Sequence, residues 1–333
     1  EAIFSSLFPK HPYGTQTVLG TQEDLKNPSI TNIKEYYKKW YVPNNMAICL
    51  SGDFDPDQMI ATIDKYFGGL KPNPDLPKLD LPKETPITAP VVREILGPDA
   101  ESVALAWRFP GAADKDVETL QVVSQILYNG QAGLIDLDLT QQQKTLSAYC
   151  YPMTMSDYSA FMMQGRPKQG QTLDEVKDLL LGELKKLREG DFDEKMLEAN
   201  INNFKLYQMQ QLENNDARAD MFVESFVNGS DWADEVTALD RMSKLTKDDI
   251  VAFANKYLKD DNYAVIYKKQ GKDPNEKKMS KPEITPIVMN RDTVSTFLKE
   301  IQASVVTPIE PVFLDYSKDL TQLKAKSDIP VLY

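Results

Sequence analysis

Two widely separated segments of this chain repeat the same order of helix and strand signals. Residues 29–52 and residues 246–269 align without a gap and share identical residues at Ile33/Ile250, Lys39/Lys256, Asn45/Asn262 and Ala47/Ala264. Each segment opens with a hydroxyl residue suited to cap a helix, continues with apolar residues at helical spacing, and ends in an apolar run of strand character. The repeat predicts a chain built from two related α/β units, of which the first is incomplete.

The first unit is predicted to contain a helix over residues 29–41, a strand over residues 46–50 and a second helix that stops at Gly68 and Gly69. Proline density then rises sharply, with Pro72, Pro74, Pro77, Pro82, Pro86 and Pro90. Such a stretch excludes helix and favours an extended connector. We therefore assign residues 1–70 to the later part of a first domain and residues 71–90 to a linker.

The second domain is predicted to span residues 91–270. Strands are expected at residues 91–96 and 102–109, a helix at 114–128, a shorter helix at 133–143, and a hairpin at 147–152 and 158–164. Thr172 and Glu175 form a capping box that starts a long amphipathic helix, which ends at Gly190. Three further helices, expected at about residues 193–212, 216–227 and 231–242, precede the second repeat segment. The class is α+β, with a mainly antiparallel sheet covered by helices in each of two homologous domains.

Residues 271–333 are predicted to be a linker and the start of a following domain. The stretch 271–286 is basic and contains proline, a helix is expected at 291–303, and strands are expected at 312–316 and 329–333. The chain begins without methionine and its last strand pattern is short, so we expect an internal piece of a longer polypeptide.

The composition excludes several classes of function. The formal net charge of −12 and the lack of a basic cluster mixed with aromatic residues argue against nucleic acid as a partner. No apolar run approaches the ~20 residues of a membrane-spanning helix, and no signal peptide is recognisable. A soluble protein of the cytoplasm or the periplasm is expected, with the compartment left open.

The chain lacks the residues that a metal site or a common catalytic site needs. A catalytic zinc ion takes three protein ligands, whereas this chain has one histidine, His11, in a turn-like Lys-His-Pro-Tyr-Gly stretch. Cys49 and Cys150 are interpreted as buried thiols, and the acidic clusters as helix caps and solvated turns. Met153, Met155, Met162 and Met163 are assigned to the core of the hairpin. We predict no catalytic, cofactor-binding or metal-binding residue.

Several motifs, in this order, resemble the pitrilysin/insulinase family of zinc peptidases, which includes mitochondrial processing peptidase. They are Pro9-Lys-His-Pro-Tyr-Gly14, Leu19-Gly20, the Tyr36-Tyr37-x-x-x-Tyr41-x-Pro43-x-Asn45-Met46 stretch, Ser51-Gly-Asp-Phe54 and Lys65-Tyr-Phe-Gly68. The resemblance covers about residues 1–270. It implies two homologous α+β domains in each half of the protein, and two halves that enclose peptide substrates in a chamber.

Comparison with this family also indicates which functional residues this chain lacks. The family binds zinc through a His-x-x-Glu-His motif and a further glutamate, and neither is recognisable here, so Glu1 is not assigned as a ligand. The family places an arginine and a tyrosine near the substrate. Tyr149 stands at the tyrosine position and is our one candidate substrate-facing residue, while Gln142 occupies the arginine position.

The leading hypothesis is therefore that this chain is part of a zinc-dependent metalloendopeptidase. In that enzyme it would supply part of the chamber wall and not the metal site. Zn²⁺ belongs to the parent family, and none is expected to bind to this chain alone. The expected partners are a peptide substrate and the rest of the polypeptide or a homologous half. The alternatives are a non-catalytic peptide-binding or scaffold member of the family and an unrelated α+β interaction module.

Overall fold

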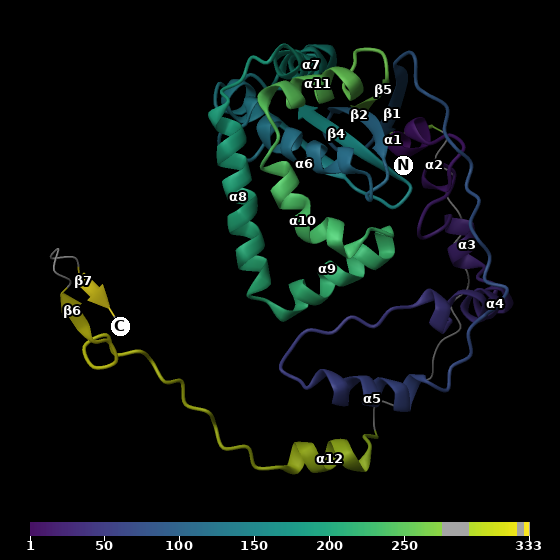
Figure 1. Cartoon of the computed structure of the whole chain (residues 1–333), viewed down its shortest axis with the longest axis vertical. Coiled ribbons are helices and arrows are strands. Elements are labelled where there is room, and N and C mark those ends of the chain that lie inside the picture. Colours follow the sequence, from purple (N-terminus) through teal and green to yellow (C-terminus); the bar gives the residue numbers. More distant parts are fainter. Residues whose placement is uncertain (275–292, 325–329, 333) are drawn as a thin grey trace. The chain divides into compact units, whose positions relative to one another are not determined.

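The computed structural model describes residues 1–274, 293–324 and 330–332, and the chain separates into two compact units (Figure 1). The first unit comprises residues 1–280 and the second residues 281–333. The first unit contains the sheet and all of the candidate sites. Among the helices of the described residues, none combines the length and the apolar character needed to cross a bilayer.

A five-stranded sheet organises the first unit. Its strands are β1 (Val91–Gly97), β2 (Ser102–Pro110), β3 (Ser147–Met153), β4 (Tyr158–Arg166) and β5 (Tyr263–Gln270). Their spatial order is β1-β5-β2-β4-β3. Only the β1–β5 pair is parallel, and the other pairs are antiparallel. The predicted α+β class and the predicted strands of the second domain are confirmed.

Three helices cover one face of this sheet, which we call the helix side. They are α6 (Lys115–Leu127), α7 (Leu173–Glu189) and α11 (Lys247–Tyr257). Alternate residues of β2 point into this core, and Trp107 is fully buried there, with its indole N–H donating to the carbonyl of Lys259 at 3.1 Å. Because side chains alternate across a strand, the intervening residues of β2 face the opposite side of the sheet, which we call the open face.

Local sequence signals fix the ends of these helices. Thr172 and Glu175 form the predicted capping box at the start of α7, and Gly190 ends that helix with φ of 72°. Beyond it lie α8 (Lys195–Leu212), α9 (Asn215–Asn228) and α10 (Trp232–Met242), close to their predicted positions. The helix predicted over residues 133–143 is shorter in the structure: residues 134–140 are helical, and Asp136–Thr140 of these form a π-helical turn, η2.

The chain before the sheet contains α1 (Ala2–Leu7), α2 (Pro12–Thr15), α3 (Gln22–Lys26), α4 (Ile30–Trp40), η1 (Pro43–Asn45) and α5 (Pro56–Phe67). The helix predicted at 29–41 is confirmed as α4, but the strand predicted at 46–50 is wrong, because these residues form no strand. A strand requires a hydrogen-bonded neighbour, and the described part of the chain places none beside this apolar run. Neither α4 nor α5 contains a buried residue.

The helical halves of the two repeat segments nevertheless share their capping bonds. Ser29 accepts a hydrogen bond from Asn32 N–H at the start of α4, as Thr246 does from Asp249 N–H at the start of α11. After each helix an asparagine side chain donates back to a main-chain carbonyl: Asn45 to Trp40 at 3.0 Å, and Asn262 to Tyr257 at 2.8 Å. The predicted equivalence therefore extends through the helix and its C-terminal turn, and stops at the strand.

The second unit contains α12 (Thr296–Ala303) and a two-stranded ribbon of β6 (Gln322–Lys324) and β7 (Pro330–Leu332). The helix predicted from residue 291 begins at Thr296. The strand predicted at 312–316 is wrong: the stretch forms no strand, and Val312 and Phe313 are 97% and 82% exposed. The strand predicted at 329–333 corresponds to β7, whereas residues 275–286 of the predicted linker lie outside the described residues.

Candidate functional site: a groove on the open face of the sheet

The open face of edge strand β3 carries an aromatic and methionine stripe. Ala148 and Cys150 point into the helix-side core, so the alternating residues Tyr149, Tyr151 and Met153 face the opposite way. Tyr151 and Met153 are 39% and 36% exposed. Large apolar side chains are thus left accessible on a surface that helices do not cover.

The neighbouring part of the open face is covered by the N-terminal segment. Leu7 and Phe8 are fully buried against Ala106, Ala160 and Ala264, which come from three adjacent strands. Alanine side chains at these positions let the backbone of α1 approach the sheet closely, which fixes α1 as a wall beside the β3–β4 hairpin.

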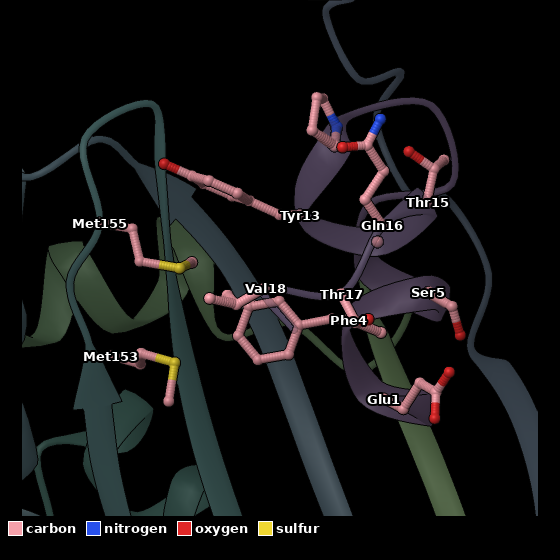
Figure 2. Close-up of a pocket in the computed structure, with 12 residues that line it drawn as sticks. Glu1, Phe4, Ser5, Tyr13, Thr15, Gln16, Thr17, Val18, Met153 and Met155 are labelled. Atoms are coloured by element: carbon pink, nitrogen blue, oxygen red, sulfur yellow. The ribbon is translucent and has the colours of Figure 1, made fainter. Parts of the chain in front are cut away.

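A cavity of about 650 Å³ lies between this wall and the hairpin. Figure 2 shows Met153 and Met155 of the hairpin on one side of the cavity and Phe4 of α1 on the other, with Val18 and Tyr13 beside them. The remaining lining includes polar groups of Ser5, Thr15, Gln16 and Thr17. A pocket of this size with thioether and aromatic walls suits a bulky apolar group, because methionine side chains adapt to varied shapes.

These two methionines depart from their predicted role. Met162 and Met163 are buried at 4% and 0% exposure, as expected of hairpin core. Met153 and Met155 instead line the cavity. The sequence gives no signal that separates the two pairs, because the difference arises from the position of α1 across the sheet.

Tyr149, the candidate substrate-facing residue, lies at the far end of the same stripe. Its hydroxyl donates to the Gln164 side-chain oxygen at 2.5 Å, and its ring stacks on Tyr151 with centroids 6.1 Å apart. It is half-buried and does not line the cavity, which begins four residues further along β3 at Met153. Burial raises the pKa of Tyr151 above its ordinary value. Gln142 is exposed in the loop before β3.

A buried polar cluster, which the sequence did not reveal, fixes the wall of the groove. The side chain of Glu84 is fully buried, and its Oε1 accepts hydrogen bonds from the backbone N–H groups of Lys10 and His11, each at 2.7 Å. Its Oε2 lies 3.8 Å from Nη2 of Arg108, and Nε of Arg108 donates to the carbonyl of Leu7 at 2.9 Å. Burial lowers the pKa of the Arg108 guanidinium. The one available signal was a single arginine within the otherwise apolar run of β2.

His11 belongs to this cluster and has a structural role, as predicted. It caps α2 by accepting the N–H of Tyr13 at Nδ1 (3.2 Å), and its Nε2 lies 3.7 Å from Oδ2 of Asp157. Its side chain is buried between the rings of Tyr13 and Tyr158. Nδ1 thus accepts a backbone hydrogen bond, whereas the buried Nε2 faces the Asp157 carboxylate without a hydrogen bond among the described residues.

The described residues do not fit a zinc site. Within the parts of the chain that the structure covers, no group of three or more His, Cys, Asp or Glu side chains is arranged to hold a metal ion. The two thiols are separate: Cys150 is buried and burial strongly raises its pKa, whereas Cys49 is only half-buried, which corrects the prediction that both are buried.

The structure thus defines a class of protein. It is an α+β domain covered by helices on one face, with an open apolar surface and, among the described residues, no cluster of metal ligands. Comparison with known families then identifies it: residues 29–204 match the family described as "Peptidase M16 inactive domain", and the chain belongs to this family. The zinc protease PqqE of Helicobacter pylori is 24% identical over 273 residues, which cover 80% of this chain and 61% of the relative. The predicted zinc-peptidase relationship is confirmed.

Solved structures support the same fold. A protease from Helicobacter pylori superposes with a TM-score of 0.75 at 22% identity, over 80% of this chain and 65% of that one. The periplasmic protease PqqL from Escherichia coli gives a TM-score of 0.65 at 14% identity, over 99% of this chain but 39% of that one. The chain thus spans less than two thirds of the length of these relatives.

Proposed function

We propose that this chain forms a non-catalytic part of the chamber wall of a zinc-dependent metalloendopeptidase, and that this part faces the peptide substrate. In this proposal the zinc ligands and the catalytic base belong to other polypeptide, and this chain alone neither binds zinc nor cleaves peptides. The observation that carries the proposal is the cavity of about 650 Å³ between α1 and the β3–β4 hairpin, beside which Tyr151 is exposed on the same face of β3 as Met153.

The groove suits an extended peptide. Strand β3 is an edge of the sheet, so its outer N–H and C=O groups are available to pair with an added strand, except at Pro152, which has no N–H. A bulky apolar side chain of that peptide would enter the cavity between Phe4 and Met155. The rings of Tyr149 and Tyr151 would contact the next alternate side chains, because alternate residues of a strand share one face.

The proposal includes the division into domains. Residues 1–70 would complete a first domain with further polypeptide, which agrees with the exposed apolar residues of α4, where Ile33, Tyr36 and Tyr37 are 55%, 62% and 60% exposed. Residues 91–270 would form the second domain, and residues 271–333 would lead into a following one. A homologous half would close the chamber. Since PqqL is named as periplasmic, we extend that location to this chain.

The test is peptide binding by the purified chain, measured by fluorescence anisotropy. A labelled neutral peptide rich in leucine and phenylalanine should bind, and a peptide of equal length made of serine and glycine should not. Met153→Glu should weaken binding at least about tenfold, because it places a second carboxylate at the apolar side of the cavity, next to Met155. The matched control is Met209→Glu on α8, where the side chain is 68% exposed outside the groove. Equal binding of both peptides would refute the proposal.

A metal measurement completes the test. Zinc added to the chain and removed by dialysis should leave less than stoichiometric metal by atomic absorption. One tightly retained zinc ion per chain would show that the ligands are present here and would contradict the assignment as wall.

A further inference from the structure

A second cavity lies on the helix side of the sheet, away from the open-face groove. It has a volume of about 430 Å³ and is formed between the end of α6, the loop that follows it, and one face of α8. Its lining is almost entirely carboxamide and aromatic: Gln125, Asn129, Gln131, Asn200, Asn203, Phe204 and Tyr207. None of these lining side chains is charged.

Asn200 is the buried centre of this lining. It is 2% exposed, and its Oδ1 accepts a hydrogen bond from Nδ2 of Asn129 at 3.3 Å. Its own Nδ2 is buried and has no hydrogen-bond partner in the structure. A buried donor without an acceptor destabilises the folded state. We therefore expect a ligand in the cavity to supply a hydrogen-bond acceptor for this N–H₂ group.

The rest of the lining offers both donors and acceptors. The side chains of Gln125 and Gln131 make no hydrogen bond within the described residues, and each provides a carbonyl oxygen and an N–H₂ group. The Tyr207 oxygen accepts from Gln211 at 2.8 Å, which leaves its O–H free to donate. Phe204 adds an apolar ring to one side.

We propose that this cavity binds a neutral carboxamide, the side chain of a glutamine or asparagine presented by a peptide or by the free amino acid. A carboxamide carries one acceptor for Asn200 Nδ2 and two donors for the neighbouring amide oxygens, so its polar atoms find partners. A carboxylate of the same shape is disfavoured, because no cation in the lining compensates for its loss of hydration. The methylene groups of a glutamine side chain pack on Phe204.

The test is a titration of the ¹⁵N-labelled chain followed through its side-chain N–H₂ signals by NMR, with N-acetyl-glutamine amide as probe. The N–H₂ signals of Asn200, identified by their absence in Asn200→Leu, should shift and saturate with a Kd on the order of 1 mM, as befits a small ligand. N-acetyl-glutamate amide should bind at least tenfold more weakly at pH 7. Free glutamine as a second probe distinguishes a peptide-borne group from the free amino acid.

Two variants separate recognition from structure. Asn200→Leu fills the same volume without the donor and should abolish the response of the remaining lining signals. Asn202→Leu is the matched control, because Asn202 lies on the same helix, is exposed and does not line this cavity, and should leave the response unchanged. The proposal would be overturned if the glutamine and glutamate probes bound equally well, or if Asn200→Leu kept an unaltered response. It would also be overturned if glucose, added as an unrelated polar ligand, saturated the same signals. The absence of any shift at about tenfold the expected Kd would overturn it too, and would show that water alone satisfies Asn200.

Discussion

The backbone N–H of His11 donates a 2.7 Å hydrogen bond to Oε1 of Glu84. This contact joins the start of the chain to the proline-rich linker, and the same carboxylate faces Arg108 of the central part of the sheet. One buried side chain thus ties three separate stretches of sequence together, and it holds α1 in place as the wall of the groove.

The stability of the chain should depend on Glu84. In Glu84→Ala, two backbone N–H groups lose their acceptor and the Arg108 charge loses its partner, so the free energy of unfolding should fall by about 3 kcal/mol. Urea denaturation followed by circular dichroism measures the change. Asp80→Ala, an exposed acid in the same linker, should stay within about 0.5 kcal/mol of the parent. If the two variants lost equal stability, the contact would not be a specific tie.

The capping box of α11 should contribute to pH dependence. Hydrogen bonds from the side chain and the backbone N–H of Thr246 lower the pKa of Asp249. The unfolded chain then binds this proton at a higher pH than the folded chain, so the contribution is present above the ordinary carboxyl pKa of about 4 and is lost as the pH falls through the lowered value. Asp249→Asn should therefore lose less stability than the parent between pH 5 and pH 2. A matching change in Asp248→Asn, its exposed neighbour, would argue against the cap as the cause.

The two thiols should differ in reactivity. Cys49 is half-buried, whereas Cys150 is buried, its Sγ lies 3.7 Å from the carbonyl of Ser124, and burial strongly raises its pKa. Since the thiolate is the reactive form, Ellman's reagent at pH 8 should modify one thiol per native chain and both thiols in denaturant. Cys49→Ser should abolish the native reaction. A native Cys49→Ser chain that still reacts would place Cys150 in contact with solvent.

Tyr149 should act through its ring and not through its hydroxyl. Its O–H is already engaged by Gln164, so Tyr149→Phe should cost about 1 kcal/mol of stability and keep the affinity for the apolar peptide within about twofold. Tyr149→Ser removes the stacking surface beside Tyr151 and should weaken the peptide by about fivefold or more. Anisotropy titrations of both variants decide the question. A loss of affinity in the Phe variant equal to that in the Ser variant would assign binding to the hydroxyl.

Sequence alone predicted the parts of the fold that depend on near neighbours. Thr172 and Glu175 of the capping box are three residues apart. The alternation of buried side chains in β2 involves the consecutive residues from Val103 to Phe109. Such signals are local, so they survive whatever surrounds them. The same logic failed at residues 46–50, where the apolar run indicates a strand but the pairing that makes a strand depends on a distant partner.

The groove was beyond prediction for a related reason. Tyr149 was found by its place in a family motif, but the cavity exists only because α1 crosses the open face and presents Phe4 to Met153 and Met155. That placement depends on Glu84 and Arg108, which lie far from α1 in the sequence and carry no motif. Contacts of this kind depend on tertiary packing, so no periodic pattern of apolar residues in the sequence predicts them.

The position of β5 between β1 and β2 has a consequence for how the protein is made. The last strand of the sheet to leave the ribosome is an inner one, and it supplies the pairing of β1 within this sheet. A nascent chain that has not yet reached residue 270 therefore holds β1 unpaired and one edge of β2 open, so the complete five-stranded sheet assembles only after synthesis of the whole stretch. Pairing across such a long sequence separation is slow, and the waiting chain is a natural client for chaperones.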